Sequence, residues 1–475
     1  MDLPLSFIEQ ITALLGHEEA GRLAQTLQGA PLTSIRLNAA KCREVPADMS
    51  PLRRVPWCDT GYYLGQRPSF TFDPLLHAGA YYVQEASSMF VGQAVRAYLP
   101  SDSSVAVLDL CAAPGGKSTL LRSLLPGGSL LVANEVVRSR AQILVENLVK
   151  WGHPDVVVTH NDPSDFAPLA GCFDAILADV PCSGEGMFRK DPASVDEWSP
   201  ANVEVCWQRQ RRILSDIWGC LKPGGLLLYS TCTYNSKENE ENVRWIRNEW
   251  GAEVLPLQVP SDWGITGNLL PEENFPVYRF FPHRTPGEGF FLAVLRKPDA
   301  GEDGRMFSFR RGKKVGADKR KGVKNAPAFS KEQLRLVQGW CDLPDGYAVQ
   351  VQDDTAFAFP KAWEPLLDAL RSSLHVLHAG VPLARLKGKD LVPCHALALS
   401  TVLCRRAFPC CEFDYRQAIA YLQREAVQLP SGTPSGFVLA TYHDFPLGFL
   451  KNIGNRANNL YPQEWRIRKA LRTDS

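Results

Sequence analysis

The sequence has no long apolar run. No stretch reaches the roughly 18–20 uncharged apolar residues that a membrane-spanning helix needs. The first residues, MDLPLSFIEQI, include Asp2 and Glu9 and no basic segment, so they lack the pattern of an export signal. We therefore expect a cytoplasmic protein with no membrane partner. A length of 475 residues, of which 45% are hydrophobic, indicates about two to four globular domains.

The sequence also lacks paired cysteines. None of the thirteen cysteines belongs to a CxxC pair, and their odd number favours neither a disulfide framework nor a zinc site. His375 and His378 have a spacing found in metal sites, but no second pair of ligands accompanies them, so we predict no metal. Most of the cysteines are expected to be small buried apolar side chains. Two of them, described below, need another explanation.

Excess charge of either sign is absent, because the net charge is only +1. Two local segments are nevertheless basic. Residues 310–324 carry eight lysines or arginines and one acid, Asp318, a pattern typical of a solvated linker or of a phosphate-binding segment. The second segment follows Phe449 and contains Lys451, Arg456, Arg466, Arg468, Lys469 and Arg472. Because the two segments flank one carboxy-terminal region, together they favour a nucleic-acid backbone as partner.

Short apolar runs alternate with helical patterns from about residue 100 to residue 296. The runs are short enough to be buried parallel strands and lie at 105–110, 130–133, 156–159, 175–178 and 226–229. The helical faces comprise Val137, Ala141, Leu144, Val145 and Leu148, and then Ile213, Ile217 and Leu221, ended by Pro223-Gly224-Gly225. This alternation predicts a doubly wound α/β domain over residues 76–298.

Weaker patterns complete the domain plan. A helix near 8–15 and a strand at 34–38 indicate a small mixed module over residues 1–75. Strands near 277–283 and 290–296 are expected to form an antiparallel edge of the sheet. The polar segment 299–327 has the composition of a linker, and residues 328–475 form a carboxy-terminal region without a chemical motif.

A glycine-rich turn follows the first strand, in the sequence DLCAAPGGKST at 109–119. Ligands of a doubly wound sheet bind at the carboxyl ends of its strands. Gly115 and Gly116 allow close approach of the backbone to a ligand, and Lys117 begins a helix whose N-terminus can face an anion. A nucleotide-binding phosphate loop would need a glycine at position 111, which is Cys111. The pattern therefore argues against an NTPase.

Acids end the next two strands. Glu135 lies 19 residues after Gly116, a distance at which a carboxylate can accept hydrogen bonds from ribose hydroxyls. Such an acid can also be simply a solvated residue at a helix start. Asp162, after the third strand, is expected to bind an adenine amino group, although its spacing supports this role less strongly than the spacing of Glu135 supports ribose binding. Because no basic residue nearby suggests a second phosphate, a nucleoside cofactor agrees with the pattern at least as well as a dinucleotide.

Two cysteines lie in polar loops beyond the fourth and fifth strands. Asp179 and Cys182 occur in ADVPCSGEGMFRKDP, and Cys232 occurs in YSTCTYN. Adjacent strand ends are about 5 Å apart, so these three side chains can converge on one pocket. With thirteen cysteines in the chain, a chance position near the sheet is the alternative. Their polar surroundings favour a functional role.

These motifs, in this order and spacing, resemble the Nop/Sun family of RNA cytosine-5 methyltransferases, and specifically its bacterial subgroup that modifies small-subunit ribosomal RNA. The resemblance covers residues 80–296. More loosely, LGFLKNIGNRANNLYP at 447–462 resembles the PUA-like RNA-binding domain of that subgroup, and residues 1–75 resemble its amino-terminal RNA-contacting module. The resemblance implies a Rossmann-like domain that uses S-adenosylmethionine (AdoMet). It assigns AdoMet binding to Cys111, Ala112, Ala113, Pro114, Gly115, Gly116, Lys117, Glu135, Asp162 and Asp179.

The same resemblance implies the catalytic roles. Cys232, in the STC motif, corresponds to the cysteine that attacks carbon 6 of cytosine and thereby activates carbon 5. Asp179 would interact with ring N3, and Lys117 would assist Asp179. Cys182 corresponds to a second cysteine that helps to remove the carbon 5 proton or to release the adduct. DNA cytosine-5 methyltransferases attack with the Pro-Cys cysteine instead, so this order of roles depends on the resemblance.

The implied substrate is 16S ribosomal RNA, free or in the small subunit, and we expect a monomeric enzyme. A transfer RNA methyltransferase has the same motifs and is the nearest alternative. A ribosome-assembly factor that binds RNA without catalysis is a second alternative, although the presence of both cysteines and Asp179 counts against it. For a small-molecule methyltransferase, the basic segments and the carboxy-terminal region would have no purpose.

Overall fold

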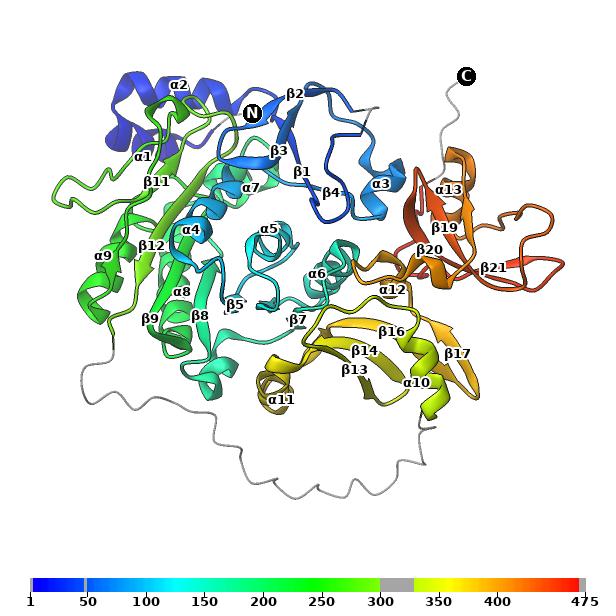
Figure 1. The fold of residues 1–475 in the computed structure, drawn as a ribbon. Coiled ribbons are helices and arrows are strands. Elements are labelled where there is room, and N and C mark those ends of the chain that lie inside the picture. Colours follow the sequence, from blue (N-terminus) through cyan, green and yellow to red (C-terminus); the bar gives the residue numbers. More distant parts are fainter. Residues whose placement is uncertain (1–2, 47–48, 300–328, 470–475) are drawn as a thin grey trace.

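The computed structural model describes residues 3–46, 49–299 and 329–469. Within these residues the chain forms an amino-terminal module, a central α/β part and a carboxy-terminal region (Figure 1). The basic segment 310–324, almost all of the expected linker and Arg472 lie outside the described residues. None of the described helices is long and apolar enough to cross a membrane.

The amino-terminal module has a helical hairpin and a four-stranded sheet in the order β2-β3-β1-β4. Its elements are α1 (Leu5–Leu15), α2 (His17–Leu27), β1 (Thr33–Leu37), β2 (Pro51–Val55), β3 (Cys58–Leu64), α3 (Pro74–His77) and β4 (Tyr81–Val83). Because β4 pairs with β1, this sheet extends beyond residue 75. Phe7 and Ile11 of α1 are fully buried. They pack with Phe188 and Trp198 of the central part, which joins the module to it.

Five parallel strands form the middle of the central sheet. The strand order is β10-β12-β9-β8-β5-β6-β7-β15, and β5 to β9 run parallel. Their bounds are β5 (Ala106–Asp109), β6 (Leu130–Asn134), β7 (Val156–Thr159), β8 (Phe173–Asp179) and β9 (Leu221–Thr231). Such strands are apolar throughout because helices cover both faces of the sheet. The predicted doubly wound α/β fold is confirmed.

Helices cover the two faces and form two separate cores. Helices α4 (Val91–Tyr98), α5 (Gly116–Leu124) and α6 (Arg138–Trp151) pack on one face. Helices α8 (Pro200–Trp218) and α9 (Glu240–Trp250) pack on the other, and the short α7 (Ala193–Glu197) precedes α8. The helix predicted to include Leu221 ends at Trp218, so that part of the prediction is wrong. Leu221 begins β9 and pairs with Phe173, because the sheet ladder there satisfies its main-chain groups.

The predicted antiparallel pair is present near the β10 edge of the central sheet. Strand β11 (Tyr278–Phe280) pairs with β12 (Phe290–Arg296). Strand β12 also pairs with β9 and with β10 (Glu253–Val254), so it lies within the sheet.

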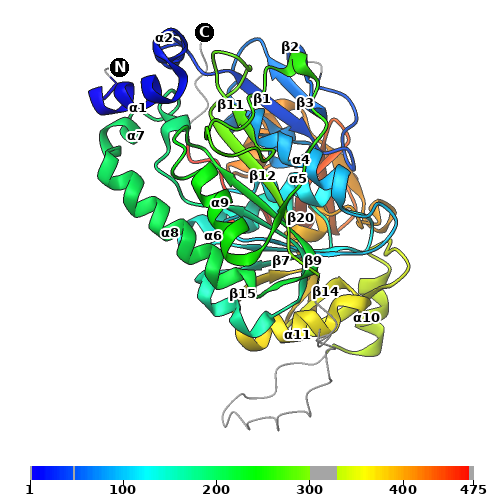
Figure 2. The same cartoon turned by 90° about the vertical axis from the view of Figure 1, so that its left-hand side faces the viewer.

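The carboxy-terminal region contains two further four-stranded sheets. The first sheet and its helices comprise α10 (Lys331–Gln338), β13 (Tyr347–Gln352), β14 (Thr355–Pro360), α11 (Glu364–Ser373), β16 (Val381–Lys387), β17 (Asp390–Pro393) and α12 (His395–Leu399). The second comprises β18 (Cys410–Glu412), α13 (Tyr415–Leu422), β19 (Gly436–Tyr442), β20 (Phe445–Asn452) and β21 (Ala457–Asn459). Strand β15 (Val376–Ala379), which follows α11, leaves this region and pairs antiparallel with β7 of the central sheet (Figure 2).

Candidate active site at the carboxyl ends of the parallel strands

The glycine turn lies between β5 and α5, at the carboxyl end of the sheet. Gly115 adopts the left-handed conformation, with φ of 115°, in which other residues are strained. The main-chain carbonyls of the turn are fixed from α6, because Arg140 donates to Ala113 O at 2.9 Å and Asn147 donates to Pro114 O at 2.8 Å. The first turn of α5 therefore presents main-chain N–H groups at a defined place, which suits a ligand carboxylate.

A buried arginine of the amino-terminal module stabilises this turn through a residue of α5. Arg36, on β1, is fully buried, and its Nη2 lies 2.6 Å from Thr119 Oγ1. The Thr119 hydroxyl in turn donates to Gly115 O at 2.8 Å. Sequence reasoning did not single out Arg36, since an arginine in a strand far from the glycine motif has no distinguishing signal.

Glu135 and Asp162 lie at the ends of the next two strands. Glu135 is 2% exposed; its Oε1 accepts from Val137 N at 2.9 Å, and its Oε2 lies 3.4 Å from Arg140. Asp162 is half-buried and caps the 3₁₀ helix η3 (Pro163–Leu169), with Arg212 at 3.5 Å. Because β6 ends at Asn134 and β7 at Thr159, both carboxylates lie at the same carboxyl edge of the sheet as the glycine turn.

Asp179 ends β8 and lies between two hydrogen-bond donors. Lys117 Nζ lies 2.8 Å from Asp179 Oδ2, and Ser230 donates to Asp179 Oδ1 at 2.7 Å. Burial alone would lower the pKa of Lys117, but the charge and hydrogen bond of Asp179 raise it overall. Lys117 is therefore a permanent cation at neutral pH, and it holds the carboxylate in one orientation. Ser230 lies two residues before Cys232, and sequence reasoning missed it.

The structure brings the two loop cysteines together. The Sγ atoms of Cys182 and Cys232 lie 3.2 Å apart, and both residues are half-buried. The hydrogen bond with Cys232 and burial raise the pKa of Cys182 well above its usual value, so this thiol keeps its proton. The main chain of Cys232 is fixed because Gly186 N donates to Cys232 O at 2.8 Å. A Cβ at Gly186 would lie 2.7 Å from that oxygen, so only glycine can occupy this position without a shift.

Two buried carboxylates behind the cysteines were also missed by sequence reasoning. Glu238 accepts from Ser183 N at 2.9 Å and from Gln210 Nε2 at 2.8 Å. Glu185 accepts from the main-chain N of Tyr234 at 2.7 Å. Buried charges are stable when several donors surround them. Because these donors belong largely to the loops after β8 and β9, the carboxylates fix one loop against the other. Glu185 lies in the EGMF segment of the Cys182 motif, and this position next to the motif was the sequence feature that could have identified it.

A third buried carboxylate lies beneath the site. Asp109, the last residue of β5, is fully buried and accepts from Ser118 Oγ at 2.6 Å. Burial raises the pKa of Asp109 to about 7, while the Ser118 hydrogen bond acts in the opposite direction. Its ionisation therefore falls in the physiological range.

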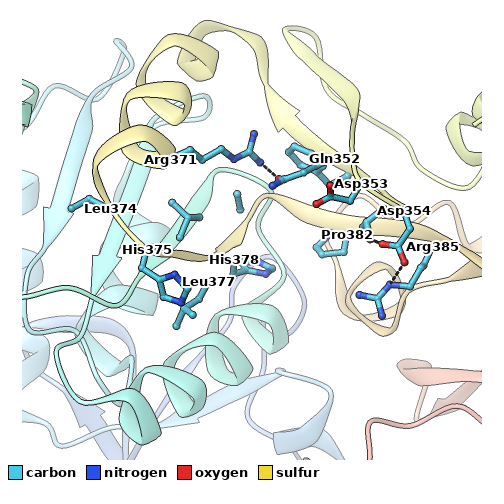
Figure 3. Close-up of a pocket in the computed structure, with 14 residues that line it drawn as sticks. Gln352, Asp353, Asp354, Arg371, Leu374, His375, Leu377, His378, Pro382 and Arg385 are labelled. Atoms are coloured by element: carbon cyan, nitrogen blue, oxygen red, sulfur yellow. Dashed lines mark hydrogen bonds and ion pairs between the residues drawn. The ribbon is translucent and has the colours of Figure 1, made fainter. Parts of the chain in front are cut away.

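His375 and His378 are not part of this site. They line a cavity of about 680 Å³ between β15 and the β13–β14 hairpin (Figure 3). In that cavity Arg371 pairs with Gln352, and Arg385 lies 3.6 Å from Asp354, so its cations have partners. Among the described residues no group of three or more histidines, cysteines or acids could hold a metal ion.

Three family models match the chain. Residues 97–296 match the 16S rRNA methyltransferase RsmB/F family, and residues 3–86 match the N-terminal domain of 16S rRNA methyltransferase RsmF. Residues 408–467 match the methyltransferase RsmF PUA domain, which confirms the PUA-like region expected near the carboxy terminus.

Relatives match nearly the full chain. The ribosomal RNA small subunit methyltransferase F of Klebsiella pneumoniae (strain 342) is 30% identical, and the alignment covers 97% of this chain and 96% of the relative. The protein of the same name from Vibrio cholerae serotype O1 (strain M66-2) is 30% identical, with 98% of each chain covered.

Solved structures agree with this match. A methyltransferase homolog protein from Pyrococcus horikoshii is 29% identical with a TM-score of 0.53, covering 62% of this chain and 95% of its own. NSun6 from Pyrococcus horikoshii, solved with SFG, is 21% identical with a TM-score of 0.52. The alignment covers 62% of this chain and 99% of NSun6, and it shows the shared fold. The resemblance inferred from the motifs is confirmed, and AdoMet is the cofactor. The chain belongs to the ribosomal RNA small subunit methyltransferase F family of AdoMet-dependent RNA methyltransferases.

Proposed function

We propose that this chain methylates carbon 5 of a cytosine in 16S ribosomal RNA through a transient covalent bond between Cys232 Sγ and carbon 6 of the base. The observation that carries this proposal is the position of Cys232. Its half-buried sulfur lies at the end of a parallel strand, 3.2 Å from a second thiol, and the neighbouring strand ends in the Asp179–Lys117 ion pair.

The chemistry requires a nucleophilic sulfur. Carbon 5 of cytosine is too weak a nucleophile to attack a methyl sulfonium. When the Cys232 thiolate adds to carbon 6, the electron pair of the 5,6 double bond moves toward carbon 5 and makes it an enamine-like nucleophile. Carbon 5 would then bond to the methyl group supplied by AdoMet while the methyl–sulfur bond breaks, and the electron pair of that bond would stay on sulfur, which leaves as S-adenosylhomocysteine. Loss of the carbon 5 proton and of the Cys232 thiolate restores the double bond.

Asp179 is the group proposed to act at ring N3. Charge develops on the pyrimidine when sulfur adds to carbon 6, and a proton taken up from water at N3 stabilises it when the Asp179 carboxylate accepts the N3–H in a hydrogen bond. Lys117 and Ser230 hold both carboxyl oxygens of Asp179, at 2.8 and 2.7 Å, so the group is already oriented before the base arrives. Such preorganisation reduces the reorganisation needed in the transition state.

Cys182 is proposed to act after methyl transfer. Its raised pKa keeps the thiol protonated, so it can donate a proton to the departing Cys232 sulfur. Once it has given up that proton, the Cys182 thiolate can accept the proton that leaves carbon 5. A neutral thiol is a poor nucleophile compared with a thiolate, which disfavours Cys182 for the attack.

The residues of the glycine turn and of the following strands are proposed to bind AdoMet. The first turn of α5 and the main chain of residues 111–117 suit the methionine carboxylate and amine. Glu135 suits the ribose hydroxyls, and Asp162 the adenine amino group. AdoMet supplies an electrophilic methyl group on sulfur. AdoMet carries one carboxylate and no phosphate. The carboxylates at this edge of the sheet therefore do not have to accommodate a second anionic group of the cofactor.

Ribosomal RNA is favoured over transfer RNA by the names of the relatives, which match this chain over nearly its whole length. Bisulfite sequencing of 16S ribosomal RNA and transfer RNA, from cells with and without this chain, tests the choice. We expect one or more protected cytosines in 16S RNA to lose protection when the chain is absent, and to regain it when the chain is returned. Loss of protection in transfer RNA alone would contradict the proposal.

A further inference from the structure

The segment between α10 and the PUA domain has no assigned role. The family models end at residue 296 and resume at residue 408. Within this interval, β15 adds an antiparallel strand to the central sheet next to β7, with Val376 opposite Thr159. Because Thr159 is the last residue of β7, the residue before Val376 lies beside the loop that follows β7.

That residue, His375, forms two main-chain hydrogen bonds with the loop. His375 N donates to Asn161 Oδ1 at 2.9 Å, and His160 N donates to His375 O at 3.0 Å. The two rings of His375 and His160 also meet edge to face, with centroids 6.1 Å apart. A strand from the carboxy-terminal region therefore contacts the two residues directly before Asp162.

Asn161 and Asp162 share a hydrogen-bond acceptor, which links the contact with His375 to Asp162. Asn161 Nδ2 donates to Asp165 Oδ2 at 2.9 Å, and the same oxygen accepts from the main-chain N of Asp162. On its other side the loop is bonded to β6, because Asn134 Nδ2 donates to Asn161 O at 3.0 Å. The backbone before Asp162 is thus held between β6 and β15.

Packing fixes the segment after Asp162 as well. Phe166 and Leu169 of η3 are buried in one core with Leu367 and Leu370 of α11. Helix α11 leads directly into His375 and β15, so the packing and the hydrogen bonds come from one continuous segment. Figure 3 shows this junction, with Arg371 and Leu374 of that segment next to His375.

We propose that residues 364–375 support the cofactor site from outside, and that the main-chain N–H of His375 is a positioning group that sets Asp162 for the adenine of AdoMet. The placement of adenine at Asp162 rests on the proposed function. The prediction is that cofactor affinity depends on a strand from the carboxy-terminal region, although that strand does not itself touch the reacting atoms.

The test removes the N–H donor alone. Proline has no N–H, and Leu374, with φ of −126° and ψ of 159°, has the extended backbone that a following proline requires. In the full chain, His375→Pro should weaken AdoMet binding about three- to ten-fold, as expected for one lost hydrogen bond. His375→Ala keeps the main-chain N–H donor, so the affinity of this variant for AdoMet should fall less than that of His375→Pro. His378→Ala, in β15 and away from the loop, is the matched control.

The readouts separate positioning from general damage. AdoMet dissociation constants are measured by calorimetry, with thermal midpoints and kcat at saturating AdoMet alongside. A weaker AdoMet complex with a retained midpoint and a nearly retained kcat supports the proposal. A general structural defect would lower the midpoint and kcat together.

A second variant covers the case in which His375→Pro does not fold. Asn161→Ala removes the acceptor of this bond and also the hydrogen bond from Asn161 to Asp165, so it should weaken AdoMet binding at least as much as His375→Pro. The double variant should be no weaker than Asn161→Ala, because that variant already lacks the bond that His375→Pro breaks. Unchanged affinity in Asn161→Ala, while Asp162→Ala binds AdoMet weakly, overturns the positioning role alone. If Asp162→Ala also binds normally, the adenine placement fails, and the positioning role fails with it.

Discussion

The Sγ atoms of Cys182 and Cys232 lie within 3.2 Å of each other, although 50 residues separate them in sequence. Parallel pairing of β8 with β9 causes this proximity, since Asp179 is opposite Ser230 and the two loops leave the sheet side by side. One thiol can therefore attack a bound pyrimidine while the other acts on the same adduct.

Cys232→Ser should reduce methyl transfer by about 10³-fold or more, because a serine hydroxyl is not ionised at neutral pH and is a poor nucleophile toward carbon 6. AdoMet binding should be retained, since the substitution leaves the cofactor residues intact. Single-turnover methylation with labelled AdoMet and calorimetry measure the two effects. Substantial turnover by this variant would instead assign the attack to Cys182.

Cys182→Ala should accumulate a covalent protein–RNA complex, because the step that releases Cys232 from the methylated base is slowed. The complex is visible as a species that survives a denaturing gel and disappears after nuclease treatment. The double variant Cys182→Ala/Cys232→Ser is the matched control and should form no complex. Normal turnover without any trapped complex would leave Cys182 with only a packing role.

Lys117→Met should lower kcat by about 10²–10³-fold, the usual cost of losing one charged group that stabilises a transition state. Without the ammonium group, Ser230 is the one side-chain donor left to Asp179 among the residues that the structure describes, so the carboxylate is no longer held in one orientation. Ser230→Ala removes a neutral donor and should have a smaller effect. Lys361→Met, at an exposed lysine of the carboxy-terminal region, is the control. Equal kcat in all variants would show that the ion pair does not contribute.

Asp109→Asn should change how stability depends on pH. Burial raises the pKa of Asp109 to about 7, whereas an aspartate in the unfolded chain titrates near pH 4. The folded state therefore binds this proton more tightly, and the resulting stability is complete below about pH 4 and is lost as pH rises through 7. The wild type should therefore lose stability relative to Asp109→Asn between about pH 4 and pH 7, and the difference should level off above that range. Denaturant unfolding at several pH values measures the difference, and a constant difference would contradict the raised pKa.

RNA affinity should fall steeply with salt if the basic segments bind phosphates. Each bound phosphate adds about −0.7 to −0.9 to the slope of log affinity against log salt. Replacing four of the eight basic residues at 310–324 by glutamine should make this slope shallower, in proportion to the phosphates that those four side chains bind. Filter binding or anisotropy between about 50 and 200 mM salt measures it. A flat response would mean that these segments do not touch RNA.

The predictable part of the structure is the part that depends on local pattern and on the geometry of parallel sheets. Alternating strands and helices predicted the doubly wound domain, and shared strand ends predicted that Asp179, Cys182 and Cys232 would lie close together. Lys117, which the family resemblance implied would assist Asp179, lies 2.8 Å from that carboxylate. Their catalytic roles stay a prediction.

The unpredictable part depends on interactions between segments far apart in sequence. Arg36 reaches Thr119 across 83 positions, and a strand pattern alone gives no indication of that partner. The spacing of Leu221 from Ile217 is helical and predicts a helix, whereas pairing with Phe173 decides its conformation. The short strand β15 lacks any local signal for the sheet that it joins, since its partner β7 lies far earlier in the chain.

The place of β15 in the chain has a consequence for biosynthesis. Translation delivers β7 early and β15 only after every other strand of the central sheet has been made. A nascent chain therefore holds the catalytic cysteines in a nearly complete domain while one border of the sheet is still open. If the segment that ends in β15 sets cofactor affinity, methyl-donor capture begins late in synthesis, and truncated translation products with an intact cysteine pair remain poor competitors for AdoMet.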